Sequence, residues 1–64
     1  MNTPQDTLEQ LIDSMGLAYV VHALEQVCYE KADHLRSNWG DVPAAKEWER
    51  DARKLGTCAN KLYH

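Results

Sequence analysis

Apolar residues in the C-terminal third of the chain recur at spacings of three and four, which is the period of an α-helix that buries one side. The set, called here the third-helix seam, consists of Ala45, Trp48, Ala52, Leu55, Ala59 and Leu62. Asp41 precedes the seam as a capping residue, and Pro43 falls where a first helical turn tolerates proline. The pattern predicts a helix over residues 42–62 that lies along another helix.

Two further helices are predicted upstream. Thr3 and Pro4 are typical of a helix start, so we expect a short helix over residues 4–15 that ends at Gly16 in a left-handed cap. A second apolar series then predicts a long helix over residues 17–37, followed by a loop over residues 38–41. The series comprises Leu17, Val20, Val21, Leu24, Val27, Cys28, Ala32 and Leu35.

These elements predict one all-α domain over residues 1–64. If the second and third helices form an antiparallel hairpin, their equal rise places Leu24 opposite Leu55 and Leu17 opposite Leu62, so the apolar layers match. We expect the short first helix to close over this hairpin as a three-helix unit. Because 64 residues is close to the lower limit for independent folding, we also expect the unit to dimerise into a larger bundle.

Gly56 interrupts the third-helix seam, and an interior glycine costs a helix about 1 kcal/mol relative to alanine. In one interpretation the helix ends near Leu55 and Thr57 caps a short terminal turn. In the other the helix continues, and Gly56 allows a neighbouring helix to approach closely. We favour continuation because Ala59 and Leu62 stay in phase with the residues before the glycine.

Composition and charge place the chain among soluble proteins. The net charge is −3, and Cys28 and Cys58 are too few for a disulfide scaffold. Hairpin geometry separates the two thiols by about 10 Å along the axis, which is too far for a disulfide within one chain. The N-terminus has neither the basic nor the apolar region of a secretory signal, and no apolar run reaches membrane-spanning length. We expect reduced thiols, a cytoplasmic location and no membrane partner.

A second stripe on the long helix combines aromatic and hydrogen-bonding side chains. It is called here the tyrosine face and comprises Tyr19, His22, Gln26, Tyr29, Asp33 and Arg36. Tyrosine and arginine are enriched in protein interfaces, so the face predicts a contact with a second copy or with another protein. An ordinary solvated face, or a face covered by the first helix, is the alternative interpretation.

Trp39 lies in the predicted loop and is grouped with this candidate interface. The tryptophan either staples the hairpin by packing on Leu35 and Val42, or stands out as an anchor for a partner. We favour stapling.

Basic residues follow the third helix on the side opposite the seam. This basic stripe consists of Lys46, Arg50, Arg53, Lys54 and Lys61. Such a stripe could follow a phosphate backbone, which makes a nucleic-acid-associated protein the alternative function. Acidic neighbours flank the stripe, and no aromatic residue is interleaved for stacking on bases, so a solvated face is the preferred interpretation.

Candidate metal chemistry is confined to Glu30, Asp33 and His34 on the second helix. Di-iron bundles supply two Glu-x-x-His motifs, whereas Asp33 stands here at the histidine position, and a zinc site would need ligands from across an oligomer interface. We therefore assign no metal and no cofactor.

No catalytic motif accompanies the nucleophilic side chains. Lys31 falls within the apolar side of its helix, so we expect its stem to lie over Trp48. Its ammonium group is expected to reach one of the acidic residues Glu47, Glu49 and Asp51. Cys58 opposite His22 could form a thiol–base pair, although packing of the cysteine in the core is favoured. The sequence predicts a non-enzymatic interaction or regulatory module.

Two segments carry a resemblance to known sequences. The run from Cys28 to Trp39 (CYEKADHLRSNW), followed by Ala45 to Arg50 (AKEWER), resembles a set of short, uncharacterised bacterial and bacteriophage proteins, over roughly residues 11–55. The resemblance implies a small cytoplasmic accessory protein and assigns no site residue.

Overall fold

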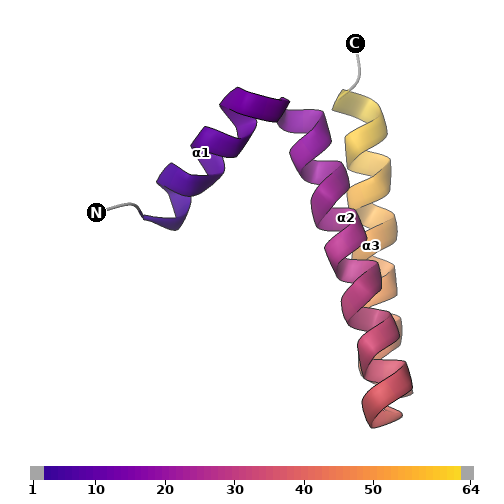
Figure 1. Cartoon of the computed structure of the whole chain (residues 1–64). Coiled ribbons are helices and arrows are strands. Elements are labelled where there is room, and N and C mark those ends of the chain that lie inside the picture. Colours follow the sequence, from indigo (N-terminus) through magenta and orange to yellow (C-terminus); the bar gives the residue numbers. More distant parts are fainter. Residues whose placement is uncertain (1–2, 63–64) are drawn as a thin grey trace.

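The computed structural model describes residues 3–62, and all of its regular elements are helices. In chain order they are α1 (Pro4–Met15), α2 (Leu17–His34), a π-helical turn η1 (Leu35–Trp39) and α3 (Val42–Leu62) (Figure 1). The predicted all-α class with three helices is confirmed. The second α-helix is shorter than expected, because its last turn widens into η1, which also takes up two residues of the expected loop. Within the described part of the chain, no helix combines the length and apolarity needed to cross a membrane.

Short polar side chains cap the N-termini of two of the helices. The Thr3 hydroxyl accepts a hydrogen bond from the Asp6 backbone N–H at 3.2 Å, and the Asp6 carboxylate accepts one from the Thr3 N–H at 3.2 Å. This reciprocal capping box satisfies two backbone donors at the start of α1. At the start of α3, the Asp41 carboxylate accepts a hydrogen bond from the Ala44 N–H at 3.1 Å. Both helix starts lie where the sequence predicts them.

Glycines turn the chain at both junctions, with different backbone geometry. Gly40 ends η1 in the left-handed helical region, at φ 62° and ψ 21°. Gly16 has φ 89° but ψ 152°, so the predicted left-handed helical cap is wrong at this junction. Its N–H still bonds the Ile12 carbonyl at 2.7 Å, while the extended ψ redirects the chain before α2 starts at the next residue.

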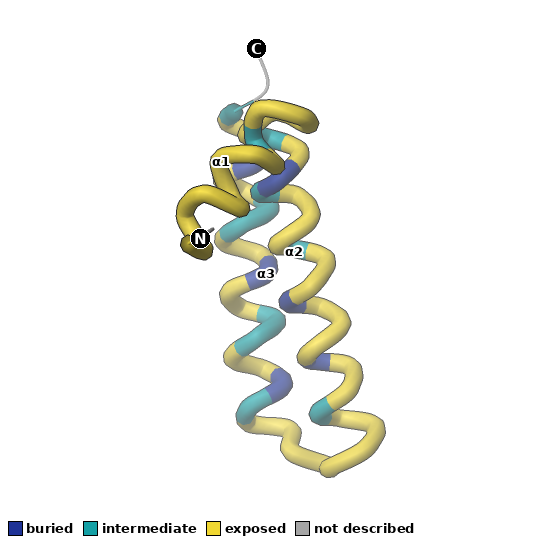
Figure 2. Tube along the Cα trace, turned by 60° about the vertical axis from the view of Figure 1, so that its left-hand side comes forward, coloured by how far each residue is buried: buried dark blue, intermediate teal, exposed yellow. Residues whose placement is uncertain are grey.

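Helices α2 and α3 lie side by side in opposite directions, and the buried residues lie where they face each other (Figures 1 and 2). The buried set consists of small or medium-sized residues: Val20, Cys28, Ala32, Ala45, Ala52 and Ala59. The three alanines of α3 allow the helix axes to approach closely. Trp48, Leu55 and Leu62 are only half-buried, so the larger members of the third-helix seam lie at the margin of this contact.

Helix α3 continues through Gly56, as favoured from the sequence. A Cβ atom built on Gly56 would lie 2.6 Å from the Oε2 atom of Glu25 on α2. That distance is shorter than normal van der Waals contact, so the glycine accommodates the side chain of the neighbouring helix. Glu25 also lies 3.1 Å from the Nδ1 atom of His22.

The Gly56→Ala variant is expected to be more stable than the wild type by about 0.5 kcal/mol. Alanine recovers about 1 kcal/mol of helix propensity, and part of this gain is lost because the flexible Glu25 side chain must turn away from the new methyl group. In a Glu25→Ala background the gain should approach about 1 kcal/mol. Urea unfolding followed by circular dichroism measures both values. A loss of stability in both backgrounds would show that the α2 backbone, rather than the carboxylate, requires the glycine.

Helix α1 does not close over the other two helices, so that expectation is wrong. It projects at an angle from the start of α2, contacts α2 alone among the described elements, and buries none of its 12 residues (Figures 1 and 2). Antiparallel neighbouring helices are normally joined by two to five residues, whereas Gly16 is the only residue between α1 and α2. The short junction therefore holds α1 away from the α2–α3 pair.

Candidate interaction surfaces

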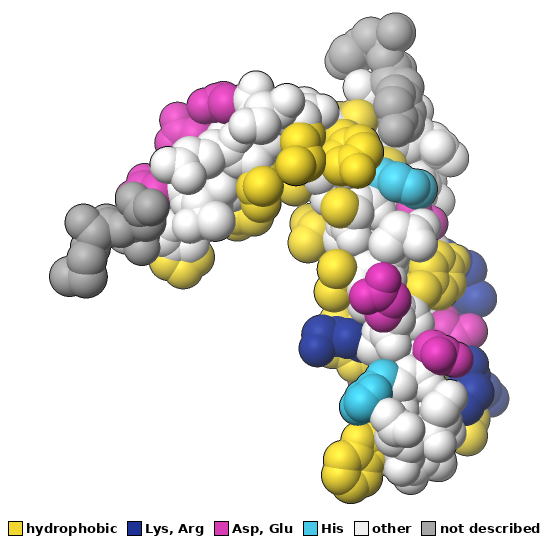
Figure 3. Space-filling view, in the orientation of Figure 1, with side chains coloured by type: hydrophobic (Ala, Val, Ile, Leu, Met, Phe, Trp, Pro, Cys, Tyr) yellow, Lys and Arg dark blue, Asp and Glu magenta, His cyan; other side chains and the backbone are white. Residues whose placement is uncertain are grey.

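Large hydrophobic side chains are exposed on the inner side of the angle between α1 and α2. Figure 3 shows them along the side of α1 that faces α2 and along the adjoining side of α2. We call this the concave apolar surface and define it by Leu8, Leu11 and Met15 of α1 and Leu17, Leu24 and Val27 of α2. All six residues are between 38% and 52% exposed. An apolar stripe on each of two adjoining helices is typical of a surface that binds protein.

Helical periodicity explains why these residues share one side. Leu8, Leu11 and Met15 are three and four residues apart, which places them on one face of α1. On α2, Leu17 and Leu24 are seven residues apart, and a further seven residues lead to Lys31. Lys31 adjoins Trp48 of α3, so the concave apolar surface continues from α2 towards the half-buried ring of Trp48.

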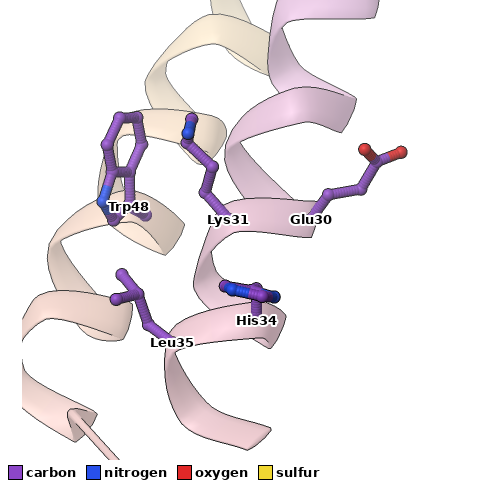
Figure 4. A pocket seen from close by; sticks show the side chains of 5 residues that line it. All are labelled: Glu30, Lys31, His34, Leu35 and Trp48. Carbon is purple, nitrogen blue, oxygen red and sulfur yellow. The ribbon is translucent and has the colours of Figure 1, made fainter. Parts of the chain in front are cut away.

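Lys31 and Trp48 form a cation–π contact beside this surface. The Lys31 Nζ atom lies 5.5 Å from the centre of the Trp48 ring, which confirms the predicted position of the lysine. The two residues line a hollow of about 380 Å³ with His34 and Leu35, while Glu30 at its edge points away from the tryptophan (Figure 4). The expected ion pair of Lys31 with an acidic residue of α3 is not present within residues 3–62. The ammonium group instead lies over the Trp48 ring.

The tyrosine face lies on another side of α2 and is open to solvent. Tyr19 is 55% exposed and Tyr29 is 39% exposed, so α1 does not cover the face. Tyr29 and His22 border a polar hollow of about 490 Å³, whose opposite wall is formed by Arg53, Thr57 and Asn60 of α3. The remaining residues of the face, Gln26, Asp33 and Arg36, are exposed as well. This side therefore offers hydrogen-bonding groups and two aromatic rings.

Trp39 is 74% exposed, so the expectation that it staples the α2–α3 connection is wrong. Val42, one of its two expected neighbours, is also exposed. The expectation assumed an open loop, whereas Trp39 is the last residue of η1, and the direction of its side chain is fixed by that helical turn. The exposed ring belongs with the anchor interpretation considered from the sequence.

Three members of the basic stripe converge on one shallow hollow. Lys46, Arg50 and Arg53 line a space of about 250 Å³ together with Arg36 of η1 and Glu49. Arg36 donates a hydrogen bond to the Glu49 carboxylate, which places a negative charge among the cations. Lys54 and Lys61 are exposed elsewhere on α3. The hollow thus carries a mixed charge rather than a continuous basic track.

The candidate metal ligands do not converge. Across residues 3–62, no three histidine, cysteine or acidic side chains come close enough to hold one ion. His34 is instead within hydrogen-bonding distance of the Asn38 amide nitrogen, at 2.7 Å. Cys28 and Cys58 are both free thiols, with Cys28 buried and Cys58 exposed. The expectation that Cys58 packs in the core is therefore wrong. Ala59 points towards α2 and is buried, and Cys58, one residue earlier, is turned about 100° away from Ala59 around the helix.

Sequence reasoning assigned Leu17, Leu24 and Val27 to the contact between α2 and α3, and so missed the concave apolar surface. A signal was present in the sequence. The apolar series of α2 spans about 140° of the helix circumference, which is wider than the strip that one neighbouring helix covers. The excess width indicates a second partner on the same helix.

The chain was compared with protein-family models, with curated proteins and with solved structures, and none of them matches it. Evidence for the function therefore comes from the surfaces of the protein. Of these, the concave apolar surface is the one whose exposure costs free energy in water, because apolar area is stabilised by removal from solvent. The tyrosine face and the basic hollow are polar and tolerate solvation.

Proposed function

We propose that the protein is a non-enzymatic helical interaction module that acts as a homo-oligomer, with a dimer as the basic unit. The observation that carries the proposal is the concave apolar surface, formed jointly by α1 and α2 and left open by the single chain. Isolated short helices are marginal in water, so a helix such as α1 that buries nothing needs a partner to stay folded.

The exposed area supports this proposal. The accessible surface of the chain is 5062 Å², whereas a compact protein of 7.3 kDa exposes about 4,200 Å². The excess of roughly 900 Å² is close to the roughly 800 Å² that each partner buries in a standard protein–protein interface. A second copy would bring the exposed area per chain back to the value of a compact domain.

The shape of the chain supports it as well. The principal extents are 37, 33 and 12 Å, so the thinnest direction is about the diameter of one helix. The radius of gyration is 13.7 Å, compared with about 11 Å for a compact domain of this length. Stable domains are built from at least two packed layers. One chain supplies a single layer, and dimerisation would supply the second.

The alternative function, association with nucleic acid through the basic stripe, has weaker support. The ion pair between Arg36 and Glu49 already occupies the hollow where the cations converge. The tyrosine face and Trp39 are available for a further protein partner beyond the dimer. Two free thiols are compatible with the reducing cytoplasm, which we propose as the location.

Sedimentation velocity over a concentration series tests the proposed function. We expect the mass to rise towards twice 7.3 kDa between about 1 µM and about 1 mM, the range of weak to moderate protein affinities. If the dimer is tighter than this range, the mass should equal twice 7.3 kDa throughout. The Gln26→Lys variant, which places a charge on the tyrosine face, should sediment as the wild type does. A strict monomer throughout this range would contradict the proposal.

A further inference from the structure

We infer that the concave apolar surface is filled by α1 of a second copy, so that two chains exchange their first helices. In this arrangement each α1 lies in the angle of its partner and packs on the partner's α2 and on the adjoining margin of α3. The inference rests on the proposed homo-oligomer and specifies which elements meet in it. Three observations favour it over pairing of α1 with α1, or of one α2–α3 pair with the other.

The first observation is that α1 cannot reach its own apolar partner surface. The single residue Gly16 separates α1 from α2, which is too short to fold α1 back along α2. Yet the apolar stripe of α1 and that of α2 both face the inside of the angle (Figure 3). A helix from another chain meets no such connection constraint and can lie along the apolar stripe of α2.

The second observation is the agreement in length. Helix α1 has 12 residues and is therefore about 18 Å long. The exposed apolar strip of α2 runs from Leu17 to Lys31, which spans about 21 Å at the same rise per residue. One α1 helix thus covers the strip almost completely. The larger half-buried residues Trp48 and Leu55 on α3 would form the far wall of the contact.

The third observation is charge. The charged residues of α1 are all acidic: Asp6, Glu9 and Asp13. Direct pairing of two α1 helices would bring six carboxylates onto one small unit, and like charges repel. All seven lysine and arginine residues follow α1 in the chain, and Lys31 lies at the end of the apolar strip itself. The acidic helix is therefore better accommodated on the α2–α3 pair of the partner than on the partner's α1.

Symmetry makes the exchange self-limiting. A two-fold axis repeats each contact, so the contact of one α1 with the partner is matched by the reverse contact. Both concave apolar surfaces are then filled, and no apolar stripe is left to bind a third chain. The exchange predicts a closed dimer rather than a filament.

Two full-length variants, examined singly and as a mixture, test the inference. Leu11→Glu places a charge on the apolar stripe of α1, and Leu24→Lys places one on the strip of α2. Gln10→Glu and Gln26→Lys are the matched controls, because they add the same charges at exposed positions outside the concave apolar surface. Dimer affinity is measured by analytical ultracentrifugation, and helicity by circular dichroism at the same concentrations.

We expect each of the two variants to weaken the dimer by about tenfold or more, while the controls stay within about twofold of the wild type. An equimolar mixture should recover most of the lost affinity and helicity. In the mixed dimer one contact joins two wild-type surfaces, and the other brings the introduced carboxylate to the introduced ammonium group. Recovery on mixing also shows that the single variants can fold, even if each is unfolded alone.

The outcomes separate the inference from the proposed function. A wild-type protein that stays monomeric overturns both. A wild-type dimer that is weakened by only one of the two variants overturns the exchange and leaves the dimer standing, because pairing of like elements involves only one of the substituted surfaces. A dimer that both variants weaken, without recovery in the mixture, also overturns the exchange.

Discussion

Replacement of Ala52 by leucine is expected to lower the free energy of unfolding by about 3 kcal/mol. Ala52 is 0% exposed and lies midway along α3, between Ala45 and Ala59. These three alanines set the distance between α2 and α3, so a larger side chain must push the helices apart or adopt a strained rotamer. Leucine is nearly as good a helix former as alanine, so lost helix propensity cannot explain the effect.

Lys54→Leu is the matched control for this substitution, because it introduces the same side chain two residues further along the same helix at an exposed position. Urea unfolding at a fixed protein concentration should place Lys54→Leu within about 0.5 kcal/mol of the wild type. If Ala52→Leu were equally neutral, the close approach of α2 and α3 would not be what stabilises the protein.

The elements of this fold could be predicted because their signals are local. Thr3 and Asp6 cap α1 through hydrogen bonds to residues three positions away, and Asp41 does the same for α3. The alanine series of α3 is equally explicit, because three small residues at the same angular position leave room for a neighbouring helix. Such signals depend on the neighbouring sequence alone and are unaffected by what packs on the other side.

The arrangement of α1 could not be predicted in the same way. Its apolar stripe is consistent with packing on the same chain or on another chain, since periodicity states that a face is buried and not by what. The expectation that α1 closes over the other helices assumed that one chain must cover all its apolar faces. Gly16, with its extended ψ angle, determines the direction of α1 instead, and that angle follows from the geometry of a one-residue junction.

The candidate sites predicted from the sequence differ from those in the structure for a related reason. The tyrosine face was predicted as an interface from its composition. The structure leaves this face exposed and gives no further physical reason to expect that a partner buries it. Leu24 and Val27 were assigned to the core from their hydrophobicity, yet they are 43% and 45% exposed. A buried side and an exposed apolar side have the same composition, so sequence alone does not separate the core from an interface. Their separation requires knowing that α3 covers only one strip of α2.

The thermal midpoint of unfolding is expected to rise by about 5 °C for each tenfold increase in protein concentration. Unfolding of a dimer releases two chains, so mass action shifts the equilibrium towards the folded state at higher concentration. Two chains of 64 residues at about 0.7 kcal/mol per residue give an unfolding enthalpy of about 90 kcal/mol, which sets this slope. Circular dichroism melts over a hundredfold concentration range provide the measurement.

Gln10→Glu should keep this concentration dependence, because the added charge lies outside the concave apolar surface. A midpoint that stays constant over the whole range, with reversible unfolding, would mean that the single chain is stable by itself. That result would be hard to reconcile with the contacts of α1, since a helix that buries none of its residues has only its capping box and a short contact with α2 to hold it. Folding and self-association are therefore expected to be one process in this protein, because in the proposed exchange the apolar surface that stabilises α1 belongs to another copy.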